Sequence, residues 1–190
     1  MSERAKQQAQ FMAAALRHVI RRSEAARPGD DLTPLQWAAL RFFALANSLS
    51  RTVSGFASYN ATSRGTASQV IKQLEERGCI RRLHSPDDGR SAEIRLTEAG
   101  EKMLARIPEG RLSDAIADLG ESDQRVFARV VRRLLDQCRD SDDGVNVGTC
   151  RDCRCLRDTG GTLRRCSRTD RLLRTEELDA LCVIHEPEIT

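Results

Sequence analysis

The sequence of 190 residues has few aromatic side chains: five Phe, one Trp and one Tyr. It has no run of 18 apolar residues, which excludes a membrane-spanning helix. The first residues, MSERAKQQAQF, lack the apolar core of a signal peptide, so we expect a cytoplasmic protein with no membrane partner. The formal net charge is only +3, so any contact with nucleic acid must come from local placement of charge.

The sequence also lacks the usual constellations of catalytic residues. The three histidines, His18, His84 and His185, are isolated, and none is paired with a nucleophile in a Ser-His-Asp or Cys-His arrangement. No glycine-rich phosphate-binding loop is present. We therefore expect that the protein is not an enzyme.

The stretch from Ser63 to Gly78, SRGTASQVIKQLEERG, predicts the helix around which the chain is organised. Its apolar residues recur at the spacing of one helix face: Ala67, Val70, Ile71 and Leu74. The other face carries polar or cationic side chains that suit base edges and phosphates in a DNA major groove: Arg64, Ser68, Gln69 and Lys72. An ordinary surface helix with a solvated face is the competing interpretation, and the flanking sequence decides between the two.

The flanking sequence predicts a helix-turn-helix followed by a β-hairpin. A short helix at 53–59 and a turn of about three residues precede the 63–78 helix. Two alternating strands at 79–84 and 92–96 surround a turn rich in Pro, Asp and Gly. A hairpin directly after a recognition helix is a wing.

Amphipathic helices are predicted at both ends of this core. One spans about residues 3–22 and another 123–138, and their apolar stripes are too wide for one small domain to cover. Thr33 and Gln36 predict a capping box at the start of a further helix. The expected fold class is mainly α with a small β-hairpin wing, and we expect a homodimer formed through the N- and C-terminal helices.

The segments QVIKQLEERG and CIRRLHSPDDGRSAEIRLTEAG resemble the winged-helix core of the MarR family of transcriptional regulators. The shared elements are a LEERG-type helix end at 74–78, a D-x-R wing tip at Asp88 and Arg90, and an LTEAG-type helix start at 96–100. The resemblance covers about residues 5–138. It implies a dimer that binds double-stranded DNA at a palindromic operator.

The helix face and the resemblance together predict which residues contact DNA. The residues expected to face bases are Arg64, Thr66, Ser68 and Gln69, those expected to meet phosphate are Arg51 and Lys72, and Arg90 is expected to enter the minor groove from the wing tip. The chain departs from the family at Asn60 and Ala61, where the family usually has an apolar residue followed by Gly.

Of the seven cysteines, only Cys79 lies before residue 138. Four follow the spacing C-x2-C-x-C-x10-C: Cys150, Cys153, Cys155 and Cys166. In a cytoplasmic chain, such density favours metal binding or redox chemistry over a disulfide framework. Eight arginines and three aspartates between residues 150 and 174 are expected to lower the thiol pKa values. The chain thus divides into a predicted DNA-binding and dimerisation domain, 1–143, and a cysteine-rich metal- or cluster-binding segment, 144–190.

Three states of these cysteines are considered: no common ligand, a structural Zn²⁺ with four thiolates, and a [2Fe-2S] cluster. Structural zinc sites usually use paired C-x2-C knuckles, and only one knuckle is present. The CRDCRCL segment resembles the start of the [2Fe-2S] motif of SoxR, a redox sensor of the MerR family. There the fourth cysteine follows after five residues rather than ten, so Cys138 or Cys182 could replace Cys166. Cys182 otherwise reads as a buried small hydrophobe in an apolar run.

These observations predict a sequence-specific DNA-binding transcriptional regulator whose DNA affinity is controlled by a redox-responsive [2Fe-2S] cluster. One alternative is a repressor with a structural Zn²⁺ site that senses a small phenolic ligand in the dimer cleft. A thiol/disulfide redox sensor is another. An electron-transfer or cluster-carrier protein that merely keeps the winged-helix fold is the last, and it would show no sequence-specific DNA binding.

Overall fold

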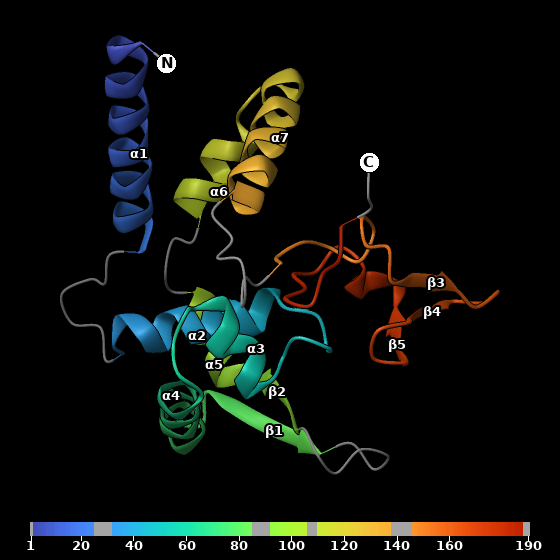
Figure 1. The fold of residues 1–190 in the computed structure, drawn as a ribbon. Helices are drawn as coiled ribbons and strands as arrows, with labels where there is room; N and C mark the ends of the chain where they lie inside the picture. Colours follow the sequence, from blue (N-terminus) through green and yellow to red (C-terminus); the bar gives the residue numbers. More distant parts are fainter. Residues whose placement is uncertain (1, 25–31, 85–91, 106–109, 138–145, 188–190) are drawn as a thin grey trace.

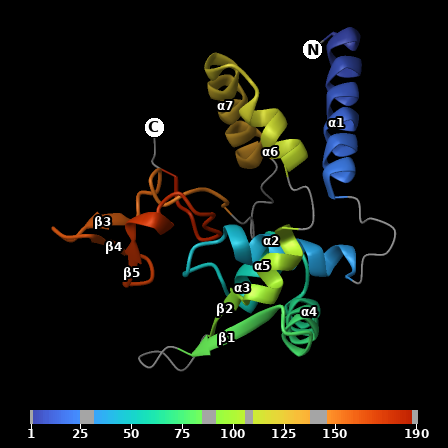
Figure 2. The ribbon, with the colours of Figure 1, turned by 180° about the vertical axis from the view of Figure 1, so that it is seen from behind.

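The computed structural model describes residues 2–24, 32–84, 92–105, 110–137 and 146–187. A helical core with a β-hairpin forms the lower part of the molecule in the view of Figure 1. Helix α1 (Glu3–Glu24) and the pair α6 (Gly110–Ala117) and α7 (Glu121–Gln137) stand on one side of this core, and both views place them there (Figure 2). A small C-terminal sheet lies beside the core. The predicted fold class, mainly α with a hairpin wing, is confirmed.

The helix-turn-helix consists of α3 (Val53–Tyr59) and α4 (Arg64–Glu76), which follow α2 (Pro34–Leu45). The predicted capping box at α2 is confirmed, because Gln36 N donates to Thr33 Oγ1 and Thr33 N donates to Gln36 Oε1. In the turn between α3 and α4, Ala61 has a φ of +47°, the left-handed conformation that favours glycine. Ala61, which stands where the family usually has glycine, thus has a backbone conformation that favours glycine.

Helix α4 buries the four apolar side chains that its periodicity singled out: Ala67, Val70, Ile71 and Leu74. Ser63 caps its N-terminus, since Thr66 N donates to Ser63 Oγ at 3.1 Å. Just beyond its last turn, Gly78 has a φ of +68°, as expected of the residue that ends a helix. The helix that the sequence predicts is thus present, with its caps.

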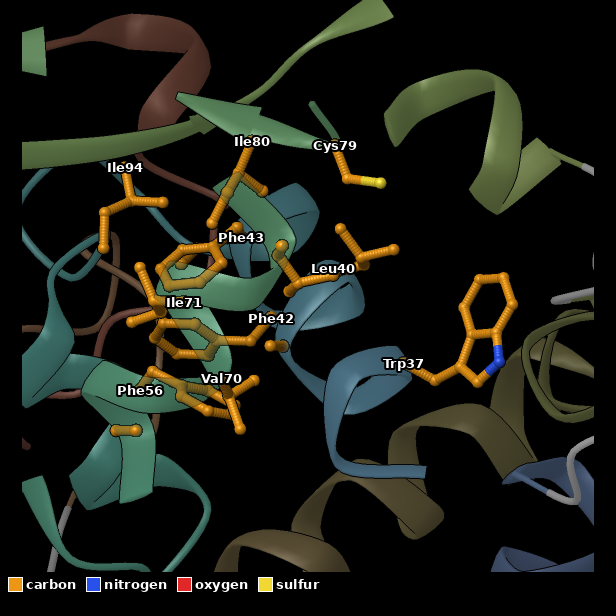
Figure 3. Close-up of a cluster of buried hydrophobic side chains, with 14 of the residues drawn as sticks. Trp37, Leu40, Phe42, Phe43, Phe56, Val70, Ile71, Cys79, Ile80 and Ile94 are labelled. Atoms are coloured by element: carbon orange, nitrogen blue, oxygen red, sulfur yellow. The ribbon is translucent and has the colours of Figure 1, made fainter. Parts of the chain in front are cut away.

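The core concentrates the few aromatic residues of the chain between α2, α3 and α4 (Figure 3). Phe42, Phe43 and Phe56 are each 1% exposed or less, and their rings lie with centroids 5.2 to 5.9 Å apart. Ile80 and Ile94 of the hairpin close the core from the other side. Aromatic side chains bury large apolar areas, so these three of the five Phe residues contribute to the stability of this core.

The predicted wing is an antiparallel pair of strands, β1 (Ile80–His84) and β2 (Ala92–Leu96), with Ile80 opposite Leu96. Helix α5 (Glu98–Ala105) follows directly. Ile94 N donates to Arg51 O at 2.7 Å, so strand β2 is attached to the segment that precedes α3. The wing tip, including Arg90, lies outside the described residues.

Helices α1 and α7 expose their apolar stripes in the single chain. Phe11 is 71% exposed and Met12 57%, while Val130 in α7 is 45% exposed. No side chain of α7 is fully buried within the described chain. As expected from the sequence, one copy leaves these stripes uncovered. Among the described helices, none combines the length and apolar character needed to cross a membrane.

The C-terminal segment (residues 146–187) contains a three-stranded antiparallel sheet that the sequence did not lead us to expect. Its strands are β3 (Leu156–Asp158), β4 (Leu163–Cys166) and β5 (Arg171–Arg174), and the short 3₁₀ helix η1 (Thr175–Glu177) follows. The chain then returns to the end of α2, where Ala46 and Leu181 form a parallel bridge. The predicted domain boundary at 143/144 lies outside the described residues.

Candidate nucleic-acid interface and cysteine cluster

The solvent face of α4 carries the predicted base-contacting and phosphate-contacting side chains. All five are exposed: Arg64, Thr66, Ser68, Gln69 and Lys72. Gln36 Nε2 donates to Gln73 Oε1 at 3.0 Å, which fixes α4 against α2. Lys72 Nζ lies 3.8 Å from Glu76 Oε1 with 65% of its side chain exposed, and such a surface pair is weak. The apolar face of α4 is therefore packed against the core while its polar face stays exposed.

Arg51 lies in a different environment from the other predicted phosphate contact. Its Nη1 is 3.6 Å from Glu93 Oε1 at the base of the wing, and 20% of its side chain is exposed. Arg95 Nε donates to the same carboxylate at 2.7 Å. Two guanidinium groups thus share the Glu93 carboxylate beside the hairpin. Arg51 would have to break its ion pair with Glu93 in order to contact a DNA phosphate.

The six residues Ala46–Arg51, here called the docking loop, join α2 to the helix-turn-helix and receive the C-terminal segment. Asn47 is 0% exposed and is bonded on three sides. Its N donates to Leu181 O at 2.9 Å, its Oδ1 accepts from Ser50 N at 3.0 Å, and its Nδ2 donates to Cys150 Sγ at 3.4 Å. One buried amide therefore connects a cysteine sulfur to the loop that leads into α3.

Glu177 forms a second connection between the C-terminal segment and the docking loop. Its carboxylate accepts from Ser48 N at 2.9 Å and from Arg174 N at 3.1 Å. Burial by itself raises the pKa of Glu177, but these hydrogen bonds and the Arg174 charge outweigh burial and hold the pKa below its usual range. Nearby, Val183 N donates to Ser50 Oγ at 3.1 Å. The carboxylate and the hydroxyl thus satisfy buried backbone donors on both sides of the contact.

Five buried cysteines gather in the C-terminal segment and are called the cysteine cluster. They are Cys150, Cys153, Cys155, Cys166 and Cys182, each 7% exposed or less. None is in a disulfide, and they pack with Leu49, Leu173 and Leu178 in one apolar cluster. The structure therefore brings the four predicted ligands together and adds Cys182. Cys138 lies outside the described residues.

The thiols of the cysteine cluster act on one another electrostatically. The neighbouring thiol is the largest cause of the raised pKa of Cys150 and of the pKa of Cys182, which is lowered to about 6. In addition to burial, Cys153 raises the pKa of both Cys150 and Cys155. From the sequence we interpret Cys182 chiefly as a buried hydrophobe, because its apolar neighbours give no sign of Cys150, which lies 32 residues earlier. No local pattern points to Asn47, whose cysteine partner is 103 residues away.

The expected lowering of thiol pKa values by arginines is wrong for two of these cysteines. The neighbouring Cys182 thiol, together with burial, raises the pKa of Cys150, and burial raises the pKa of Cys155. The arginines stay at the surface and pair with carboxylates, as when Arg154 and Arg168 both contact Glu186. Arg154 also interacts electrostatically with Cys153 and Cys155, but at Cys155 burial outweighs this attraction.

Within the described ranges, no three His, Cys, Asp or Glu side chains are grouped so as to hold a single metal ion. The donor chemistry nevertheless suits a thiolate-bound group, because five buried sulfurs face a common apolar interior. Backbone and amide donors already reach two of them: Glu186 N lies 3.4 Å from Cys153 Sγ, and Asn47 Nδ2 lies 3.4 Å from Cys150 Sγ. Hydrogen bonds to sulfur are also a feature of iron-sulfur sites, where they tune the reduction potential.

The helix-turn-helix, its exposed polar helix and the adjoining hairpin define a winged-helix protein, and comparison with known proteins identifies its family. Residues 30–91 match the sequence profile of the MarR family. Transcriptional regulator HosA of Escherichia coli O111:H- is 31% identical over 109 residues, which cover 56% of this chain and 79% of HosA. This chain belongs to the MarR family of transcriptional regulators.

Solved structures show the same fold. A MarR family protein from Bacillus stearothermophilus has a TM-score of 0.50 and 22% identity, over 72% of this chain and 97% of that one. FabT of Streptococcus pneumoniae, solved in complex with DNA, has a TM-score of 0.50 and 17% identity, over 70% and 96% of the two chains. The family match ends at residue 91, so it leaves the resemblance of the cysteine motif to SoxR untested.

Proposed function

We propose that the protein is a homodimeric, sequence-specific DNA-binding regulator whose DNA affinity is controlled by a redox-responsive [2Fe-2S] cluster in its C-terminal segment. The observation that carries this proposal is the contact between the cysteine cluster and the docking loop. Asn47 Nδ2 donates to Cys150 Sγ, and the same residue accepts from Ser50 N three residues before α3 begins. Two hydrogen bonds of Asn47 thus connect the cysteine cluster to the loop that leads into the helix-turn-helix.

DNA recognition is assigned to α4. In this proposal Arg64, Thr66, Ser68 and Gln69 read base edges, and Lys72 contacts phosphate. Their common exposure on a helix whose other face is fully buried supports the assignment. Arg51 and the wing-tip Arg90 complete the predicted phosphate and minor-groove contacts.

Dimerisation is assigned to α1 and α7, whose exposed apolar stripes a second copy of the chain would cover. A two-fold dimer presents two α4 helices to a palindromic operator, and these helices must lie about 34 to 36 Å apart to enter successive major grooves. A small change in the placement of α4 in each copy alters this separation. DNA affinity is therefore sensitive to the structure of the docking loop.

The ligands are assigned to Cys150, Cys153 and Cys155 with one further cysteine, Cys166 in the sequence-based prediction. When bound, a [2Fe-2S] cluster supplies a reversible one-electron change. The chain's own residues keep the docking loop in place through hydrogen bonds. Cys150 accepts from Asn47, Glu177 accepts from Ser48, and Ser50 accepts from Val183. Release of these contacts would free the docking loop and reposition α3 and α4. Zn²⁺ in place of the cluster would provide structure without a redox signal.

Anaerobic purification followed by an absorption spectrum and by iron, sulfide and zinc analysis tests the cofactor. DNA fragments selected by the protein from a random library then allow affinity to be measured with the cofactor oxidised and reduced. We expect bound iron and sulfide and a difference in DNA affinity of at least about tenfold between the two states. A colourless protein with one zinc per chain, or equal affinity in both states, would refute redox control.

The DNA contacts have an independent test with a matched control. Lys72→Ala is expected to weaken binding to all sequences alike and to reduce the salt slope by about 1. Gln69→Ala is expected to cost about 1 to 3 kcal/mol and to relax the preference for one base pair. Lys102→Ala removes an exposed lysine on α5 that is likewise paired with a glutamate four residues away, and it should change neither. If Lys72→Ala and Gln69→Ala match this control, the assignment of α4 is wrong.

A cavity favours one alternative function, a regulator that senses a small apolar ligand. Its volume is about 420 Å³, within the range of small-molecule sites, and it lies between α7 and the C-terminal segment. Leu45, Val131, Leu135, Leu181 and His185 contribute to its lining. Release of a selected DNA fragment by phenolic ligands, retained in a variant with all cluster cysteines changed to serine, would favour this function.

A further inference from the structure

We infer that the outward face of the C-terminal sheet is a second DNA-binding surface, which contacts backbone phosphates of the DNA that flanks the site read by α4. This inference rests on the DNA recognition proposed above and is independent of the cofactor. The observation that carries it is the strand register, which sorts the side chains of β3, β4 and β5 between two faces.

The inward face of the sheet packs on the cysteine cluster. Residues that lie opposite each other on neighbouring strands point to the same face. Leu156 lies opposite Cys166, and Arg164 lies opposite Leu173. Leu156, Cys166 and Leu173 all pack in the apolar cluster that contains the other buried cysteines. The alternate strand positions therefore point away from the protein.

The outward face carries arginine and leucine side chains. Its five strand positions are all exposed: Arg157, Leu163, Arg165, Leu172 and Arg174. Arg157 lies opposite Arg165 and Leu163 lies opposite Arg174. None of the five is acidic, and over residues 156–174 six arginines and two aspartates leave four positive charges in excess. This face thus presents a concentrated positive charge to solvent.

The charge of the Arg157–Arg165 pair is only partly compensated within the protein. Like charges directly opposite each other on neighbouring strands are destabilising. Arg157 Nη1 donates to the carbonyl oxygens of Arg154 at 2.5 Å and Leu156 at 2.9 Å, and among the described residues it has no carboxylate partner. Arg165 Nη1 donates to Asp170 Oδ1 at 2.7 Å. Two guanidinium groups thus have one carboxylate, and an external anion would complete the pairing.

DNA is the anion that matches this face best. A guanidinium group binds a phosphate through two parallel hydrogen bonds, and duplex DNA carries one negative charge for about every 1.7 Å of its axis. Once α4 holds a duplex, a second surface on the same molecule meets that duplex at high effective concentration. Weak phosphate contacts therefore suffice to add affinity.

The sheet also lies where flanking DNA would pass. In both views it is on the side of the core toward which strand β1 runs from α4 (Figures 1 and 2). Helix α4 and the wing are proposed to enter adjacent grooves, so the direction from one to the other follows the duplex. DNA that continues past the wing therefore extends toward the sheet.

Affinity for two lengths of one selected DNA fragment tests the inference with the full chain. The short form is the shortest that keeps the sequence preference, and the long form adds about 10 base pairs, one helical turn, on each side. We expect the long form to bind about tenfold more tightly, since four exposed guanidinium–phosphate pairs per dimer each contribute modestly. Arg157→Gln/Arg165→Gln should remove this advantage and lower the salt slope on the long form by about 4.

Two matched variants separate this contact from a general effect of charge. Arg151→Gln/Arg168→Gln removes two exposed arginines of the same segment that are paired with carboxylates, and it should keep the tenfold advantage. Arg157→Lys/Arg165→Lys retains both charges and should keep most of the advantage.

Equal affinity of the unsubstituted protein for the two lengths would overturn the inference. The same holds if Arg157→Gln/Arg165→Gln matches the Arg151→Gln/Arg168→Gln control, a result that would point to an acidic protein as the partner of this face. Failure to bind any selected fragment is a separate result, which would refute the DNA recognition by α4 on which the inference rests.

Discussion

Replacement of Glu177 by glutamine is expected to loosen the C-terminal segment from the docking loop. The carboxylate accepts from Ser48 N at 2.9 Å with one oxygen and from Arg174 N at 3.1 Å with the other. Glutamine keeps one acceptor and turns an NH₂ donor toward the other N–H. A hydrogen bond to a charged group contributes roughly 1.5 to 3 kcal/mol, so a loss of about 2 kcal/mol raises local opening about 30-fold.

Amide hydrogen exchange of the docking loop measures this opening directly. In Glu177→Gln we expect the Ser48 amide to exchange about 30-fold faster, with a similar change at Val183, which bonds to the same loop. Glu176→Gln is the matched control, because that neighbouring carboxylate is exposed. Exchange in Glu177→Gln within threefold of the control would show that the carboxylate does not hold the segment in place.

Three further outcomes can be measured. The pKa of Glu177 is held low in the folded protein, so its carboxylate stabilises the fold above the unfolded pKa near 4.3. This stabilisation is lost as the pH falls through the folded pKa. Exchange protection of the docking loop should therefore be constant from about pH 7 to 5 and fall below about pH 4. Ala61→Gly should stabilise the chain by about 0.5 to 1 kcal/mol in thermal unfolding by relieving the positive φ, whereas Ala44→Gly on the exposed face of α2 should destabilise it by about as much. Val130→Asp should weaken dimerisation about 100-fold in sedimentation equilibrium, and a chain that stays equally dimeric would contradict the assignment of α7.

The features predicted correctly from the sequence are those with short-range causes. The buried face of α4 and the capping box of Thr33 and Gln36 each follow from residues within one helix. The hairpin follows from two alternating segments around one turn. Helix propensity, capping and hydrophobic periodicity act over a few residues, so they can be read without knowledge of the fold.

The features missed from the sequence depend on distant partners. Strands β3 to β5 are only three or four residues long and carry arginines at many positions, so they lack a clear alternating pattern. The role of Asn47 could not be predicted from its sequence neighbours, because its partner Cys150 is brought beside it only by the fold. The spacing of the cysteines along the chain favoured Cys166 as the fourth ligand, whereas the fold also brings Cys182 into the cysteine cluster from outside that spacing.

The connection between Ser50 and Val183 spans 133 residues, and this separation has a consequence for the order of folding. During synthesis the winged helix leaves the ribosome long before its C-terminal contacts exist, so Ser48 N and the Asn47 amide must first be hydrated. Closing so long a loop is slow relative to forming local helices and hairpins. The regulator should therefore pass through a stage with a complete DNA-reading helix and an undocked cysteine segment, in which the thiols are open to metal delivery.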